Sequence, residues 1–125
     1  MDIIISHEQG RVPITLIKLK GMLNLGTAHR LEQVAQEQYT SGMRFLIIDL
    51  STVESLTSAG LRSIHIIYKM LKKELSTTDK YLPEQKSQPL KLVNPQPHVK
   101  RVLRISGFED FTPVYTYLTE AINSF

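Results

Sequence analysis

The sequence predicts an α/β fold: one domain with a mixed sheet of four or five strands and about four helices mainly on one face. Segments rich in β-formers alternate with amphipathic helical segments, a pattern typical of parallel strand pairs with helical cover. The run "RFLIIDL" at 44–50 is almost wholly apolar, as in a strand covered on both faces, so it belongs in the sheet interior. The first two β-rich segments are separated only by "HEQGR", which favours an antiparallel hairpin.

The hairpin is expected from "IIIS" at 3–6 and "VPITLIKLKG" at 12–21, with Gly10 in the turn between them. Helix-forming residues then dominate from Asn24 to about residue 40, and one face of this helix carries Leu31, Val34 and Ala35. Asn24 or Thr27 can cap its first turn, because both side chains carry an oxygen that accepts a bond from a free backbone N–H.

A second amphipathic helix follows the central strand and starts near Ser58. Its apolar positions recur at spacings of three and four: Leu61, Ile64, Tyr68 and Leu71. The remaining elements are a strand at "PLKLV", a short helix within "PQPHVKRVLRISG", an extended piece at "PVYT" and a last helix. The last helix is predicted from its apolar residues, which recur at helical spacing: Leu118, Ala121, Ile122 and Phe125.

The segment at about 73–89 has few large apolar residues, two prolines and many polar groups, so we expect a long, mobile loop there. A tolerated surface insertion explains it, since loop length costs little free energy. An added partner-binding element is the alternative.

Composition narrows the class of protein. With 125 residues, 42% of them hydrophobic, residues 1–125 are expected to form one domain. Cysteine is absent and the amino terminus has no apolar core of a signal peptide, so we expect a cytoplasmic protein. No apolar run approaches the roughly 20 residues of a membrane span. The net charge of +3 is mild, which argues against direct binding of nucleic acid.

Motifs for catalysis are missing. There is no GxGxxG fingerprint and no phosphate loop. No metal-ligand spacing joins the four histidines, which are His7, His29, His65 and His98. A hydrolase nucleophile elbow needs glycine two residues before its serine, where this chain has Leu56 before Ser58. We therefore predict that the protein is not an enzyme and uses no metal or cofactor.

The informative segment is "TSAGLR" at 57–62. Ser58 lies at or next to the N-cap of the second helix, where its oxygen can accept a backbone N–H bond. The same helix end, with free N–H groups and a positive dipole, can also hold a phosphate. A phosphoserine there would change binding and leave the fold in place. A capping serine and a modified serine therefore both remain possible from position alone.

The stretch "FLIIDLSTVESLTSAGLRSI" resembles the signature of the STAS domain, the fold of anti-sigma factor antagonists. "LKGMLNLGTAHRLEQ" and "LKLVNPQPHVKRVLRISGFEDFTPVYTYLTEAI" are similar to the flanking parts of that domain. The resemblance implies that Ser58 is phosphorylated by a serine kinase that is itself the anti-sigma factor. It also implies that Asp49 closes the central strand and that Asn24 lies beside the phosphorylation site.

By the same resemblance the domain is a regulatory protein-binding module in signal transduction and transcription regulation, switched off by phosphorylation. Gly60 would allow close approach of the partner, Leu61 and Arg62 would border Ser58, and further contacts would come from Asn24, Thr27, Thr57 and Ala59. Many antagonists have aspartate where this chain has Thr57, which adds a second hydroxyl that could accept the phosphate. The alternative function is a STAS scaffold or transport-accessory module that binds a protein or apolar partner without a phosphate switch.

Overall fold

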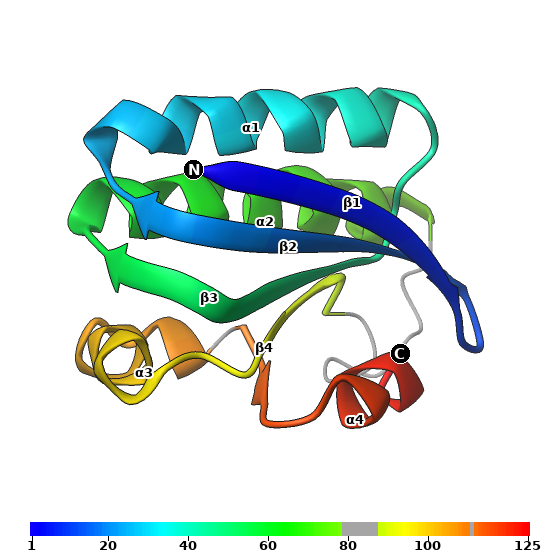
Figure 1. Ribbon diagram of the computed structural model, residues 1–125. Helices are drawn as coiled ribbons and strands as arrows, with labels where there is room; N and C mark the ends of the chain where they lie inside the picture. Colours follow the sequence, from blue (N-terminus) through cyan, green and yellow to red (C-terminus); the bar gives the residue numbers. More distant parts are fainter. Residues whose placement is uncertain (79–87, 111) are drawn as a thin grey trace.

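A five-stranded mixed sheet forms the centre of the molecule in the computed structural model, which describes residues 1–78, 88–110 and 112–125 (Figure 1). The strands lie in the order β1-β2-β3-β4-β5. Their bounds are β1 Asp2–Gln9, β2 Pro13–Leu23, β3 Leu46–Leu56, β4 Leu90–Val93 and β5 Val114–Tyr115. β1 pairs with β2 in an antiparallel manner, whereas the three other pairs are parallel. The predicted hairpin and the interior place of the "FLIIDL" strand are confirmed.

Alternation along β3 divides the core into two parts, because successive side chains of a strand point to opposite faces. Leu46, Ile48 and Leu50 contribute to the larger core cluster. Ile47 belongs to a smaller cluster on the other face. Both faces of β3 are therefore buried, which explains why its sequence is an unbroken apolar run.

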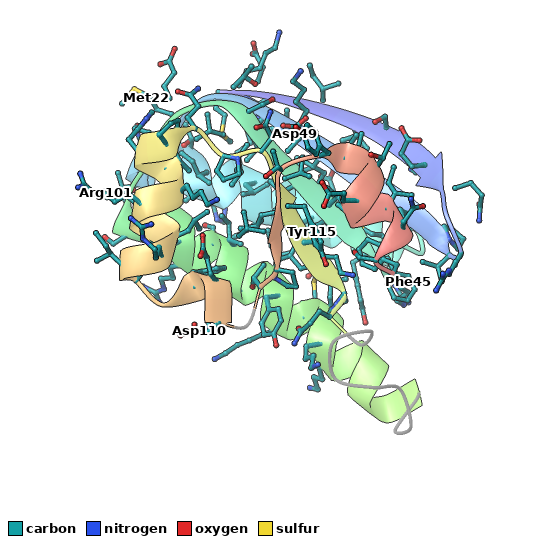
Figure 2. The ribbon with its side chains drawn as sticks, turned by 90° about the horizontal axis from the view of Figure 1, so that it is seen from below. Met22, Phe45, Asp49, Arg101, Asp110 and Tyr115 are labelled. Carbon is teal, nitrogen blue, oxygen red and sulfur yellow. The ribbon has the colours of Figure 1, made fainter. Side chains whose placement is uncertain are left out.

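The helices divide unequally between these faces. The main helices are α1 Leu25–Thr40, α2 Ser58–Thr78, α3 Pro97–Ile105 and α4 Leu118–Asn123, and a short 3₁₀ helix spans Phe108–Asp110. Buried residues of α1, α2 and α3 belong to the larger core, whereas Ala121 of α4 belongs to the smaller one. Figure 2 shows α3 and α4 on either side of the strand that carries Tyr115. The predicted placement of the helices mainly on one face is confirmed.

The central strand is longer than the sequence suggested. The apolar run predicts an end at Leu50, with Asp49 near that end, but β3 continues to Leu56 through the polar segment "STVES". The continuation pairs with the last residues of β2, and two register shifts occur along that pairing. Such shifts are typical of β-bulges, which bend a strand and accommodate extra residues. The sequence did not predict this extension because residues 51–55 are mostly polar. Their strand conformation depends on pairing with β2.

The expected loop at about 73–89 starts later than predicted. Helix α2 runs to Thr78, so the backbone of residues 73–78 is helical. The expectation of mobility falls mostly on residues 79–87, which lie outside the described part of the chain.

Candidate protein-binding site at the start of α2

The starts of α1 and α2 lie side by side at the edge where β2 and β3 end (Figure 1). A backbone bond from the Thr57 N–H to the Leu23 carbonyl, with an N···O distance of 3.1 Å, joins the two strand-to-helix junctions. This arrangement follows from the parallel pairing of β2 with β3, because parallel strands present their carboxyl ends at one edge. Residues 22–27 and 57–62, far apart in sequence, thereby form one surface.

Thr57, not Ser58, is the residue that caps α2. The Thr57 carbonyl accepts a bond from the Leu61 N–H at 3.0 Å, and its hydroxyl accepts a longer one from the Gly60 N–H at 3.5 Å. Ser58 is the first residue of α2 and its side chain is exposed. Within the described residues, the Ser58 hydroxyl makes no hydrogen bond. The structure thus gives the capping role to Thr57 and leaves the Ser58 hydroxyl accessible.

This division of roles predicts unequal effects of two alanine substitutions. Thr57→Ala removes the cap and should lower the free energy of unfolding by about 1 kcal/mol. Ser58→Ala removes a hydroxyl with no bond to lose, so its effect should stay within about 0.5 kcal/mol, the usual range for surface substitutions. Urea denaturation followed by circular dichroism measures both. A larger loss for Ser58→Ala than for Thr57→Ala would contradict the assignment.

Asn24 and Thr27 are held in a capping box at the start of α1. The Asn24 side chain accepts a bond from the Gly26 N–H at 3.0 Å, and the Thr27 hydroxyl accepts one from the Asn24 N–H at 3.0 Å. The same hydroxyl donates to the Met22 carbonyl at 2.7 Å. The prediction that one of these residues caps the helix is confirmed for Asn24. Both side chains hold the β2–α1 junction in place beside Ser58. They would therefore influence the binding of a partner through the shape of this junction.

The remaining predicted residues on the first turns of α2 differ in accessibility. Arg62 is exposed, and Ala59 and Leu61 are both half-buried. Leu61 also packs against the larger core. Gly60 is buried, and a Cβ atom there would lie 2.7 Å from the Leu23 carbonyl oxygen. Glycine at position 60 therefore has a reason inside the domain, because it leaves room for the backbone of β2. Its role in the approach of a partner stays a prediction.

A groove between α1 and α2 opens beside Ser58. It has a volume of about 490 Å³ and is lined by Leu25, Ala28, His29, Glu32, Ser58, Ala59, Arg62, Ser63 and Ile66. A second hollow of about 240 Å³ shares His29, Glu32 and Ile66 with it and extends along the helices to Met70. The side chain of Leu25 is 83% exposed and that of Ile66 43%. The groove therefore presents apolar side chains to solvent, as sites that bind proteins do.

Sequence reasoning missed the α1 side of this groove. Leu25 precedes the buried Ala28 by three positions, so helical periodicity assigns it to the core-facing stripe. In the structure Leu25 is the first residue of α1, and its side chain is exposed. No local pattern distinguishes such a residue from one that is covered.

Asp49 does not belong to this surface. It lies on β3 within the strand and its carboxylate accepts a bond from the Ser51 N–H at 2.9 Å (Figure 2). Because Ile48 and Leu50 point into the larger core, Asp49 points to the face opposite α1 and α2.

Within the described residues there is no cluster of three or more potential metal ligands. None of the helices described is both long and apolar enough to cross a membrane.

Comparisons with known proteins agree with this architecture. A family model described as the STAS domain matches residues 5–76. BtrV of Bordetella bronchiseptica, a proposed anti-sigma factor antagonist, is 32% identical over 96 residues, which are 77% of this chain and 72% of BtrV. The crystal structure of an anti-sigma factor antagonist from Mycobacterium paratuberculosis has a TM-score of 0.73 at 24% identity, covering 96% of this chain and 89% of that one.

Phosphorylated SpoIIAA, a cell fate determinant of Bacillus, has a TM-score of 0.66 at 15% identity. That similarity covers 97% of this chain and 96% of SpoIIAA, and at this identity it concerns the fold. The family match extends over more than half of the sequence and includes β2, α1, β3 and the starts of both helices at the groove. This chain belongs to the STAS domain family.

Proposed function

We propose that this domain is an anti-sigma factor antagonist that binds a serine-kinase anti-sigma factor through the surface around Ser58. The observation that carries the proposal is the exposed Ser58 hydroxyl, which has no hydrogen bond within the described residues and opens onto an apolar groove. The similarity to BtrV supports the same function. Phosphorylation of Ser58 ends the interaction, and the domain itself performs no catalysis.

The switch is electrostatic. The unmodified Ser58 hydroxyl is small and neutral, so a partner can pack over it and over Leu25 and Ile66. A phosphate adds a charge of about −1.5 to −2 at neutral pH. Removing that charge from water within an interface is costly unless the partner supplies a matching cation. Because Ser58 is at the helix start, the phosphate is tolerated by the fold and acts on binding alone.

Substitutions at Ser58 test the proposal. Ser58→Asp should weaken binding to the serine-kinase anti-sigma factor at least tenfold, or by about 1.4 kcal/mol, because it introduces a negative charge at the interface. Ser58→Ala should bind like wild type and should not be phosphorylated by that kinase. Isothermal titration calorimetry measures affinity, and mass spectrometry measures phosphate incorporation.

Thr57→Ala is the matched control, because it removes the neighbouring hydroxyl and leaves Ser58 in place. It should still be phosphorylated. If Ser58→Ala is labelled as fully as wild type while Thr57→Ala is not, the acceptor is Thr57. If neither substitution alters labelling or binding, the domain is a STAS accessory module without a phosphate switch.

A further inference from the structure

We propose that Arg62 is the counter-ion of phosphorylated Ser58, an inference that rests on the proposed function of Ser58 as the phosphate acceptor. Ser58 and Arg62 are separated by four positions on α2 and line the same groove. Residues at this spacing on a helix have Cβ atoms about 6 Å apart. The long arginine side chain therefore reaches a phosphate group on Ser58 without any change in the backbone.

The guanidinium of Arg62 is available for this contact. Its side chain is exposed, and it forms no hydrogen bond or ion pair with any residue in the described part of the chain. The groove contains one carboxylate, Glu32 of α1, and one histidine, His29. Neither forms an ion pair with Arg62 within the described residues. Before phosphorylation, Arg62 is thus a cation at the groove that has no partner among these groups.

Phosphate chemistry favours the pair. A planar guanidinium binds two phosphate oxygens at once, and such charge-assisted bonds are stronger than bonds between neutral groups. The contact holds the phosphate against the groove that Ser58, Ala59 and Arg62 line, so that it does not extend into solvent. Phosphorylation then closes part of the apolar groove in addition to adding charge. A carboxylate at position 58 is shorter and carries less charge, so Ser58→Asp imitates this state only in part.

Phosphorus NMR measures the pair directly in the isolated domain. Phosphoserine is incorporated at position 58 during translation, so no kinase is needed. The second pKa of an unperturbed phosphoserine is about 6, and we expect a lower value here because Arg62 stabilises the dianion. Arg62→Gln should raise this pKa by about half a unit, as expected for an exposed ion pair with a dianion. Arg62→Lys should restore part of the decrease, since lysine keeps the charge and loses the bidentate geometry.

Two controls separate the pair from general charge effects. Lys69→Gln removes one positive charge from an exposed position of α2 that does not line the groove, and should leave the phosphate pKa unchanged. His29→Gln tests whether the histidine that lines the groove contributes to the effect. Arg62→Gln should raise the phosphate pKa in the His29→Gln background as well.

An unchanged phosphate pKa in Arg62→Gln, or an equal rise in Lys69→Gln, would overturn the inference. This measurement needs no partner, so its outcome is separate from the test of the binding switch. Equal affinity of the phosphorylated and unmodified domains for the serine-kinase anti-sigma factor would instead refute the proposed switch, whatever the phosphate pKa. The two failures are therefore distinguishable.

Discussion

Gly60→Ala should lower the free energy of unfolding by about 2 to 3 kcal/mol, the upper part of the range for overpacking a core. The added Cβ atom would lie 2.7 Å from the Leu23 carbonyl oxygen and 2.8 Å from a methyl carbon of Leu56. A backbone oxygen cannot turn aside as a flexible side chain can, so β2 and α2 would have to separate. The direction is the reverse of the usual one, because alanine is the better helix former by up to about 1 kcal/mol.

Gly26→Ala is the matched control for this substitution. Gly26 also lies in the first turn of a helix, at the neighbouring strand-to-helix junction, but a Cβ atom there would meet only Asn24 Oδ1, at an ordinary contact distance of 3.5 Å. Its substitution should be neutral or slightly stabilising. Thermal and urea unfolding of both variants measure the difference. Equal stability of Gly60→Ala and wild type would mean that the two junctions are not packed as described.

The second large effect concerns Lys91, a buried lysine on the face of the sheet that α4 covers. Its side chain is 1% exposed, and its Nζ lies 2.6 Å from Ser124 Oγ and 4.0 Å from the centre of the Phe125 ring. Burial lowers the pKa of Lys91 from 10.5 to about 8. The charged form therefore loses hydration in the folded protein that the serine hydroxyl and the aromatic ring replace only in part.

Stability should consequently rise with pH across the interval between these values. Between pH 8 and 10.5 the unfolded chain keeps the Lys91 proton while the folded protein releases it, so increasing pH favours the folded state. At about 1.4 kcal/mol for each pH unit, the whole interval corresponds to about 3 kcal/mol. Below pH 8 both states are protonated and this contribution to stability is absent.

Lys91→Met provides the test. It keeps the length and apolar stem of the side chain and removes the titrating group, so its stability should lack this rise with pH. Subtracting its pH profile from that of wild type also removes the contribution of every other group, because those groups are present in both proteins. Unfolding in urea between pH 7 and 10.5 measures the two profiles. Parallel profiles would show that Lys91 remains hydrated in the folded protein.

Much of the fold could be predicted because its signals are local. The apolar run of β3, the helical spacing after Ser58 and the cap at Asn24 each depend on a few consecutive residues, and the structure has all of them. The resemblance to the STAS domain rested on the same segments. These signals place Ser58 at or next to the cap, and the structure assigns the cap to Thr57.

The sequence by itself determined the type and order of the elements and the position of Ser58 at the start of a helix, since periodicity and capping act within one or two turns. Only the tertiary structure decided the extension of β3 to Leu56, the need for glycine at position 60 and the groove that joins Leu25 to Arg62. Each of these depends on a partner more than 25 positions away in the chain. The end of β3 pairs with β2, Leu23 occupies the space that a side chain at position 60 would need, and α1 supplies one wall of the groove. Contacts between distant segments cannot be predicted from periodicity, because the residue pattern of one segment carries no information about where the other segment lies.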